Sequence, residues 1–159
     1  MSYERVKEFF DAKGLGDRVV VREQIGDTVE HAARSIGCKP AQIAKTMSFI
    51  VDGKPVLIVM TGDTKIDNQK YKAQFHQKAV MVPLLEVEEK IGHAPGAVCP
   101  FAIREDVPVY LDLSLKRFAT IYTAGGSLNS TVTLTVDELE QYASPVAWVD
   151  VCKDWYINK

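Results

Sequence analysis

Three parts of this 159-residue sequence combine residue types that could do chemistry: a lysine before an apolar run and two glycine-rich segments. Lys45 opens a strand-like run with Met47 and Phe49 on one face. Its ammonium could hold a phosphate or a carboxylate as a point charge over a pocket. A lysine at a strand end is more commonly a solvated surface charge, and position alone favours that simpler interpretation.

The segment 92–101, with the sequence GHAPGAVCPF, holds two glycines and two prolines in ten residues. Such loops are stiff, and glycine lets backbone N–H groups come close to a carbonyl oxygen or an oxyanion. A structural turn between a helix and a strand explains the same composition equally well.

A second glycine segment runs from Gly125 to Asn129 between two expected strands. It lacks the GxGxxG pattern and a following lysine, so a phosphate-binding loop is disfavoured. A tight connection with turn hydrogen bonds from Asn129 is the simpler interpretation. Thr61-Gly62-Asp63 ends another expected strand. Asp63 could accept a ligand amine there, although a turn carboxylate is the commoner case.

Patterns for a nucleophile or a metal are weak. Cys99 and His93 could form a thiol and its base, but they lie six residues apart in one loop, which is not a recognised arrangement. Cys99 beside Pro100 is more typical of apolar packing. The sequence contains no GxSxG, CxxC or HxxxH pattern, so we expect no metal ligands and no cofactor.

The candidate residues need a scaffold, and the chain predicts one α+β domain over residues 1–159. Residues 45–51 and 54–61 are β-rich runs joined by Asp52-Gly53, which suits a two-residue hairpin turn. Irregular alternation of strands and helices favours a mixed, mostly antiparallel sheet of about seven strands flanked by helices. The other strands are expected at 18–22, 79–82, 107–111, 119–123, 131–134 and 146–151.

Helices are expected at 3–13, 27–36, just after Pro40, at 67–75, 83–92 and 135–142. Two capping boxes support the starts of two of them, Asp27 with Glu30 and Thr135 with Glu138. The polar start and the short apolar runs predict no signal peptide and no membrane span.

Composition is that of an ordinary soluble globular protein, with 47% apolar and 25% charged residues. The net charge of −2 gives no general basic surface for nucleic acid, so any RNA contact must come from a local patch. Cys38, Cys99 and Cys152 are odd in number and widely spaced, which fits a reducing cytoplasm.

Taken in order, these segments resemble the YbaK family, the domain also inserted in bacterial prolyl-tRNA synthetases as their editing module. The resemblance covers roughly Thr28 to Val149, and its pieces in this order are specific for the family but less so for the member within it. The matching features are TVEHAA at 28–33, IAKT at 43–46, Thr61-Gly62-Asp63, Gly96-x-x-x-Pro100-Phe101 and Gly125-Gly126-x-x-Asn129.

The resemblance implies hydrolysis of the ester between an amino acid and the terminal ribose of tRNA, without metal, cofactor or protein nucleophile. Lys45 matches the family's essential lysine, and Gly96 to Pro100 matches its GxxxP substrate loop. The loop amides would hold the aminoacyl carbonyl, Lys45 would anchor the 3′ end or the reacting group, and the ribose hydroxyl with a bound water would do the chemistry. The further substrate-binding residues expected on this basis are Thr46, Thr61, Gly62, Asp63, Gly92, His93, Ala97, Pro100, Phe101, Gly125, Gly126 and Asn129.

The implied protein is a trans-acting, cytoplasmic aminoacyl-tRNA deacylase for tRNA-Pro or another tRNA carrying a small amino acid. It would act as a monomer or weak dimer, with an aminoacyl-tRNA synthetase as a plausible partner. Thr46 stands where alanine-specific members tend to carry asparagine, and no histidine follows His93, so the amino-acid specificity stays open. The alternatives are a non-catalytic module that binds aminoacyl ends or nucleotides, and a regulatory partner of a synthetase.

Overall fold

The chain folds into three small β-sheets and five α-helices, in a computed structural model that describes residues 2–24, 26 and 28–155. The helices are α1 (Ser2–Asp11), α2 (Val29–Ile36), α3 (Asn68–Phe75), α4 (Leu84–Ile91) and α5 (Val136–Ala143). Short 3-10 helices lie at Gly16–Arg18, Pro40–Gln42 and Leu113–Arg117. The strands are β1 (Val19–Val21), β2 (Ala44–Val51), β3 (Lys54–Thr61), β4 (Lys65–Ile66), β5 (Val109–Asp112), β6 (Thr120–Ala124), β7 (Ser130–Thr135), β8 (Ala147–Val149) and β9 (Cys152–Lys153).

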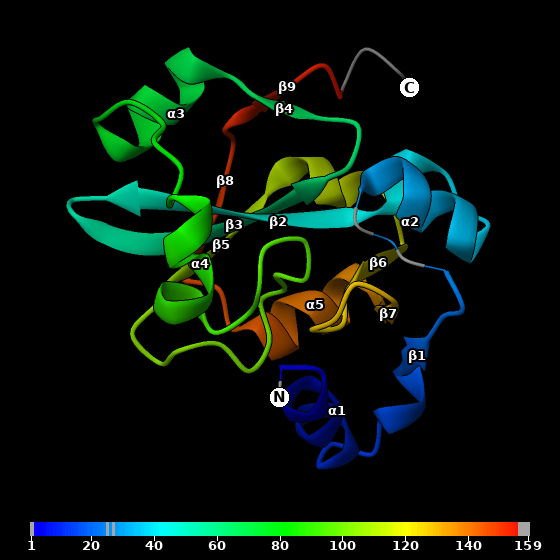
Figure 1. Ribbon diagram of the computed structural model, residues 1–159. Helices are drawn as coiled ribbons and strands as arrows, with labels where there is room; N and C mark the ends of the chain where they lie inside the picture. The colour runs from blue at the N-terminus through cyan, green and yellow to red at the C-terminus, as the bar shows by residue number, and fades with distance from the viewer. Residues whose placement is uncertain (1, 25, 27, 156–159) are drawn as a thin grey trace.

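A four-stranded sheet in the order β2-β3-β5-β8 lies at the centre of the molecule (Figure 1). β2 and β3 are antiparallel, while β5 runs parallel to β3 and β8 runs parallel to β5. Figure 1 shows α3 and the β4–β9 pair on one side of this sheet, and α4, α5 and the β1-β7-β6 sheet on the other. The order leaves β2 as an edge strand.

The turn Asp52-Gly53 sets the register of β2 against β3. Both residues have positive φ, 53° and 79°, as a type I′ hairpin turn requires. The pairing runs from Ala44 opposite Thr61 to Val51 opposite Lys54 without a bulge. The register therefore determines which face each β2 side chain takes.

Both faces of the hairpin are buried. Leu57 and Val59 pack into a cluster with apolar side chains of α1, α4 and α5, while Ile58 and Met60 pack against α3 on the opposite face. Side chains directly opposite each other in an antiparallel pair share a face. Thr46, opposite Val59, thus lies on the α4 side, and Lys45, opposite Met60, lies on the α3 side.

The expected α+β class with an antiparallel-rich arrangement is confirmed, as are the hairpin and the Thr135–Glu138 capping box. The strands divide into three sheets rather than one, and the short strands β4 and β9 were not expected. Residues 79–82 form one bridge, from Met81 to Phe49, and no strand. Among the described residues, no helix is long and apolar enough to cross a membrane.

The start of α2 also differs from the expectation. Thr28 is the N-cap, and its hydroxyl accepts a hydrogen bond from the backbone N–H of His31 at 3.1 Å. Asp27, which was expected to cap this helix, lies outside the described residues. A threonine next to an aspartate offers two candidate caps one residue apart, and the sequence pattern alone selected the wrong register for the helix start.

Candidate functional site

A cavity of about 240 Å³ lies where α2, the edge of β2, the start of α4 and both glycine loops meet. Of the residues predicted from the sequence, Lys45, Thr46, Gly96 and Asn129 line it. Its wall is largely apolar, and the apolar lining residues include Val29, Ala32, Ile43, Met81, Val82, Leu84, Val98 and Leu128. The residues from α2 and from 81–87 carry no chemical signature in the sequence, so only the fold reveals them.

The backbone of β2 forms a polar part of this wall. Ile50 N–H donates to Val80 O at 2.8 Å, and Val82 N–H donates to Ser48 O at 3.1 Å, so Ser48 and Ile50 direct their backbone groups away from β3. These directions alternate along an antiparallel strand. The N–H and C=O of Thr46, two residues before Ser48, therefore also point away from β3.

The edge of β2 is covered at two places and open between them. A bridge from Ile43 to Tyr122 covers one end, and the bridge from Phe49 to Met81 covers the other. Within the part of the chain that the structure describes, no strand pairs with the edge between these bridges. The backbone groups of Thr46 are thus available to a ligand in the cavity.

The Thr46 side chain also carries a polar group. Its hydroxyl is buried and has no hydrogen-bond partner among the described residues. A buried hydroxyl without a partner costs free energy of about 1–3 kcal/mol. Thr46 lines the cavity, but its hydroxyl oxygen is covered by the surrounding protein, so the polar groups that the residue offers to the cavity are those of its backbone.

Lys45 takes the opposite face of β2. Its ammonium donates to the backbone carbonyl of Thr64 at 2.6 Å. Burial lowers the pKa of this ammonium from its usual value, and the negative charge of Asp63 and Glu30 opposes that shift. A desolvated ammonium held by a single carbonyl is well suited to bind an anionic group.

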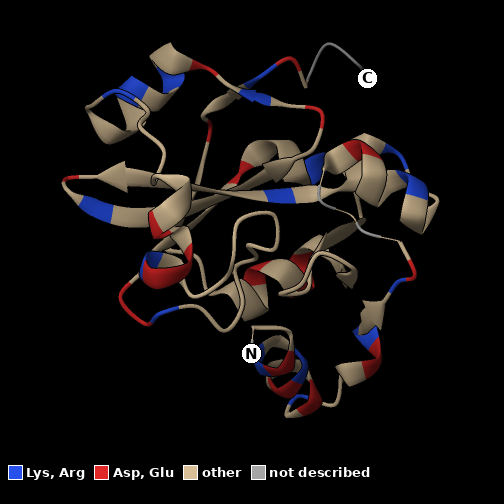
Figure 2. Ribbon diagram, in the orientation of Figure 1, with Lys and Arg blue, Asp and Glu red and all other residues tan. Residues whose placement is uncertain are grey.

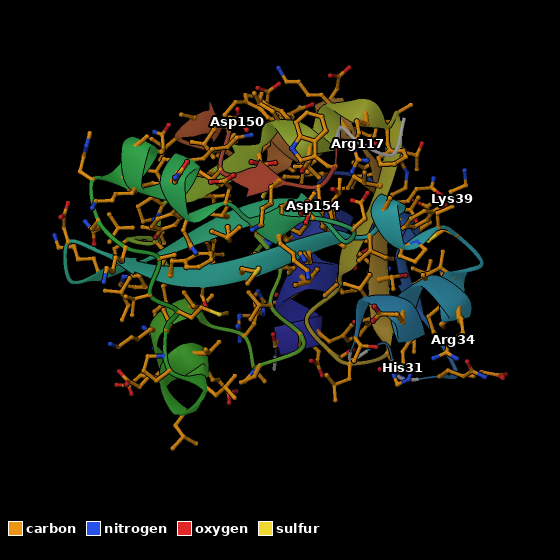
Figure 3. The ribbon with its side chains drawn as sticks, turned by 90° about the horizontal axis from the view of Figure 1, so that it is seen from above. His31, Arg34, Lys39, Arg117, Asp150 and Asp154 are labelled. Atoms are coloured by element: carbon orange, nitrogen blue, oxygen red, sulfur yellow. The ribbon has the colours of Figure 1, made fainter. Side chains whose placement is uncertain are left out.

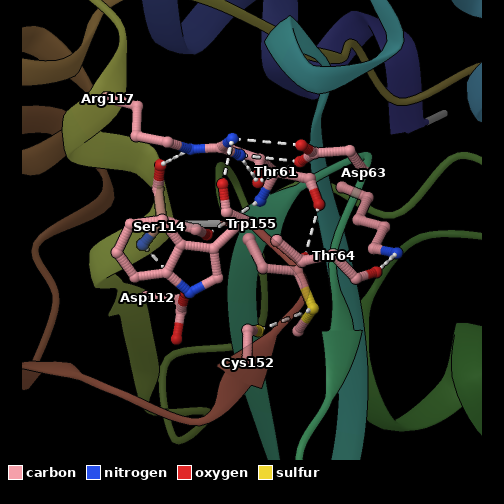
Figure 4. Close-up of polar contacts among 10 residues, drawn as sticks. Thr61, Asp63, Thr64, Asp112, Ser114, Arg117, Cys152 and Trp155 are labelled. Atoms are coloured by element: carbon pink, nitrogen blue, oxygen red, sulfur yellow. Dashed lines mark hydrogen bonds and ion pairs between the residues drawn. The ribbon is translucent and has the colours of Figure 1, made fainter. Parts of the chain in front are cut away.

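Thr61 and Asp63 form a fixed network with Arg117 (Figure 4). Arg117 donates to both carboxylate oxygens of Asp63, at 2.7 and 3.0 Å, and Thr61 Oγ1 donates to Asp63 Oδ1 at 2.8 Å. Burial favours the neutral acid, but the hydrogen bonds from Arg117 and Thr61 outweigh it and lower the pKa of Asp63. Neither Thr61, Gly62 nor Asp63 lines the cavity, but Asp63 is close enough to Lys45 for its charge to act on the ammonium.

Gly62 lies in a tightly packed place between the end of β3 and α2. A Cβ atom at Gly62 would lie 2.3 Å from the backbone oxygen of Pro40 and 2.6 Å from a methyl of Val29. Only glycine fits there. Gly62 thus packs the end of β3 against α2, which lines the cavity.

The 92–101 loop places one glycine at the cavity. Gly96 is exposed with a φ of +85°, a conformation that favours glycine. Ala97 N–H donates to Ala94 O at 3.0 Å and closes a turn around Gly96. Within the described residues, the N–H groups of Gly96 and Val98 have no hydrogen-bond partner. The loop therefore has N–H groups free to donate, while its remaining predicted residues, Gly92, His93, Ala97, Pro100 and Phe101, lie outside the cavity lining.

His93 and Cys99 meet inside this loop. His93 is fully buried, and its Nε2 donates to Phe101 O at 2.7 Å, while Cys99 Sγ lies 3.5 Å from the same nitrogen. Burial raises the pKa of the Cys99 thiol to about 12 and lowers the pKa of His93. A buried thiol with so high a pKa forms almost no thiolate at neutral pH. Their contact fits loop packing, although the two side chains are closer than their sequence spacing indicated.

The second glycine loop is held by the chain before α2. Asn129 Nδ2 donates to Arg22 O at 3.1 Å, and Arg22 N–H donates to Asn129 O at 2.6 Å. Gly125 and Gly126 do not line the cavity, whereas Asn129 does. A Cβ at Gly125 would lie 2.8 Å from Ser130 Oγ, so this glycine is needed for close packing.

Positive charge near the cavity is local. Acidic and basic residues are interspersed over the ribbon (Figure 2). Arg34 and Lys39, at the end of α2 and just after it, are exposed and extend outward from this region together with His31 (Figure 3). Among the described residues, no cluster of three His, Cys, Asp or Glu side chains could hold a metal ion.

Comparisons with known proteins identify the family of this chain. The chain is 46% identical to the uncharacterized protein YwhH of Bacillus subtilis (strain 168), over 98% of this chain and 99% of YwhH. It is 32% identical to the proline–tRNA ligase of Desulfovibrio desulfuricans (strain ATCC 27774), over 78% of this chain but only 21% of the ligase. The chain thus spans about a fifth of such ligases.

Solved structures share the fold. One, a proposed trans-editing enzyme for prolyl tRNA synthetase, superposes with a TM-score of 0.85 at 25% identity and covers 96% of this chain and 98% of its own. Another, the hypothetical protein APE2540, gives a TM-score of 0.83 at 25% identity. The sequence model of the aminoacyl-tRNA editing domain matches residues 23–142, which include Lys45 and both glycine loops. The chain therefore belongs to the aminoacyl-tRNA editing domain family.

Proposed function

We propose that this protein is a trans-acting deacylase that hydrolyses the ester of tRNA mischarged with a small amino acid. The observation that carries the proposal is the cavity lined by both the open β2 edge at Thr46 and the loop at Gly96, because both segments have backbone groups without partners among the described residues. An aminoacyl ester has the matching groups, a carbonyl oxygen that accepts and an α-ammonium that donates.

The proposed orientation of the ester follows from these backbone groups. The N–H groups at Gly96 and Val98 receive the carbonyl oxygen and stabilise the charge that develops on it during hydrolysis. The outward carbonyl of Thr46 accepts from the α-ammonium. A water molecule adds to the ester carbonyl with the help of the vicinal ribose hydroxyl, and the bond from the carbonyl carbon to the ribose oxygen breaks, so the free amino acid and the tRNA 3′ hydroxyl are released, as the family resemblance implies.

Cavity size supports a small amino acid. Its volume of about 240 Å³ lies below the roughly 300–1,000 Å³ of pockets for drug-sized ligands. Discrimination then comes from size, and one methylene is worth only about 1–3 kcal/mol.

The nucleic acid lies along the outer side of α2 in this arrangement. Arg34 and Lys39 supply phosphate contacts there, and the Lys45 ammonium binds a phosphate of the 3′ end from the other face of β2. The protein has few such contacts, so we propose that a synthetase assists tRNA selection in the cytoplasm. A synthetase regulator that binds no aminoacyl end would leave the donors of the Gly96 loop without a role, whereas a catalytically inactive binding module would use them and is distinguished by the absence of amino-acid release.

Lys45→Ala should reduce deacylation by about a hundredfold or more, because it removes the charge that holds the 3′ end. The melting temperature should change little, since the ammonium makes one hydrogen bond. Single-turnover hydrolysis of mischarged tRNA measures the effect, with Lys54→Ala at the exposed end of the same hairpin as the control. Near-normal turnover by Lys45→Ala would show that the site is assigned wrongly.

Gly96→Ala should lower kcat/KM about tenfold or more for every substrate, because alanine disfavours the φ of +85° that aims the loop amides. The added Cβ would also lie 3.0 Å from Leu128 Cδ2. Gly14→Ala is the matched control, since Gly14 has a φ of +73° with open space around it. Selective loss for one amino acid would mean that Gly96 contacts the side chain and not the shared carbonyl.

Cys99→Ser should retain most of the activity, because a fully buried thiol with a pKa near 12 is no nucleophile. Alkylation should likewise have little effect in a Cys38→Ser background, which removes the partly exposed thiol. The steady-state rate of deacylation should also be the same with and without a chelator. A hundredfold loss on any of these treatments would instead support thiol or metal hydrolysis.

A further inference from the structure

We propose that α1 acts as a clasp that fixes both glycine loops at the cavity, with Ser2 and Arg5 as positioning residues for deacylation. The inference rests on the proposed function. α1 spans Ser2–Asp11, before the segment 23–142 that matches the editing domain. The clasp is therefore a feature of this chain outside the matched segment.

Two side chains of α1 hold the start of the 92–101 loop. The Arg5 guanidinium donates to the backbone carbonyl of Gly92, the residue that ends α4. Ser2 Oγ bonds to Nδ1 of His93. Because Nε2 of His93 donates to Phe101 O, neutral His93 has no proton on Nδ1, and Ser2 must be the donor. Ser2 thus holds the His93 ring, and the same ring holds the end of the loop through its hydrogen bond to Phe101 O.

The second glycine loop rests on the same turn of α1. A Cβ at Gly126 would lie 2.8 Å from Ser2 O and 3.0 Å from Tyr3 Cα, so only glycine permits this approach. Leu128, in the same loop, lies over Gly96, whose added Cβ would be 3.0 Å from Leu128 Cδ2. Contacts therefore form a closed ring from α1 to the first loop, to the second loop and back to α1.

The core makes α1 a rigid support for this ring. Val6 and Phe10 are fully buried, and the Phe10 ring packs edge-on against Phe101 with centroids 4.9 Å apart. The Phe9 ring lies 5.9 Å from the same Phe101 ring. Phe101 ends the first loop, so the helix that holds the loop's start also packs on its end. Displacement of α1 would move the Gly96 amides relative to the β2 edge.

The experiment separates positioning from stability with single substitutions on the surface of α1. Ser2→Ala and Arg5→Ala remove the polar contacts and leave Val6 and Phe10 in place, whereas deletion of the helix would expose the core. Lys7→Ala is the matched control, because Lys7 contacts Gly16 O and Asp11, away from both loops. Any purification tag is placed at the C-terminus, away from Ser2.

We expect Ser2→Ala and Arg5→Ala to lower single-turnover deacylation about tenfold or more, with KM changed less than kcat. Amide hydrogen exchange in 92–101 and 125–129 should accelerate, while the melting temperature falls by no more than about 5 °C. Arg5→Lys should restore part of the rate, because it keeps a donor for Gly92 O. Lys7→Ala should match the wild type.

Unchanged turnover and unchanged exchange in both loops for Ser2→Ala and Arg5→Ala would overturn the clasp. Equal loss in Lys7→Ala would also overturn it, because the effect would then be general destabilisation of α1. Failure of the proposed function looks different: the wild-type protein would release no amino acid, while hydrogen exchange would still report whether α1 holds the loops.

Discussion

The register of the β2–β3 hairpin is the constraint on which the cavity depends. A slip of one residue would exchange the two faces of β2, which would put the Lys45 ammonium where the Thr46 hydroxyl is and turn the open backbone groups toward β3. The Asp52-Gly53 turn and burial on both faces prevent such a slip. The cavity also requires that β2 be an edge strand. A partner strand along the whole of β2 would form hydrogen bonds with the Thr46 backbone groups that we assign to the ester.

The polar groups around this hairpin are of two kinds: some are held by hydrogen bonds or ion pairs within the protein, and others have no protein partner. Asp63 is held by Arg117 in a two-pronged ion pair, and Arg117 also donates to Trp155 O at 2.9 Å, which ties the end of β3 to the C-terminal part of the chain (Figure 4). His93 is similarly occupied at both ring nitrogens. The outward backbone groups of Thr46 and the N–H groups near Gly96 remain without protein partners among the described residues. Groups of the second kind are the ones that a ligand can bind.

Local signals predicted a large part of this arrangement. Asp52-Gly53 identified the hairpin because its positive φ angles are a property of those two residues, and Lys45 was placed correctly at the start of β2. Residues 79–82 were predicted as a strand, but they pair with β2 through a single bridge because the chain turns into α4 directly afterwards.

Contacts between distant residues were outside the reach of sequence patterns. The pair Asp63–Arg117 joins positions 54 residues apart, and Ser2–His93 joins positions 91 apart. No sequence motif predicts either contact. The His93–Cys99 contact was considered from the sequence and set aside as a catalytic pair, and its complete burial in the structure fits a packing role.

The most direct test of the central claim is the rate at which the purified wild-type protein releases amino acids from a panel of mischarged tRNAs, measured against spontaneous hydrolysis. The account predicts accelerated release of small residues such as alanine, serine, cysteine and threonine, and no acceleration for large or aromatic ones. Release of no amino acid above the spontaneous rate, with or without a synthetase present, would contradict it, as would equal release of small and aromatic residues.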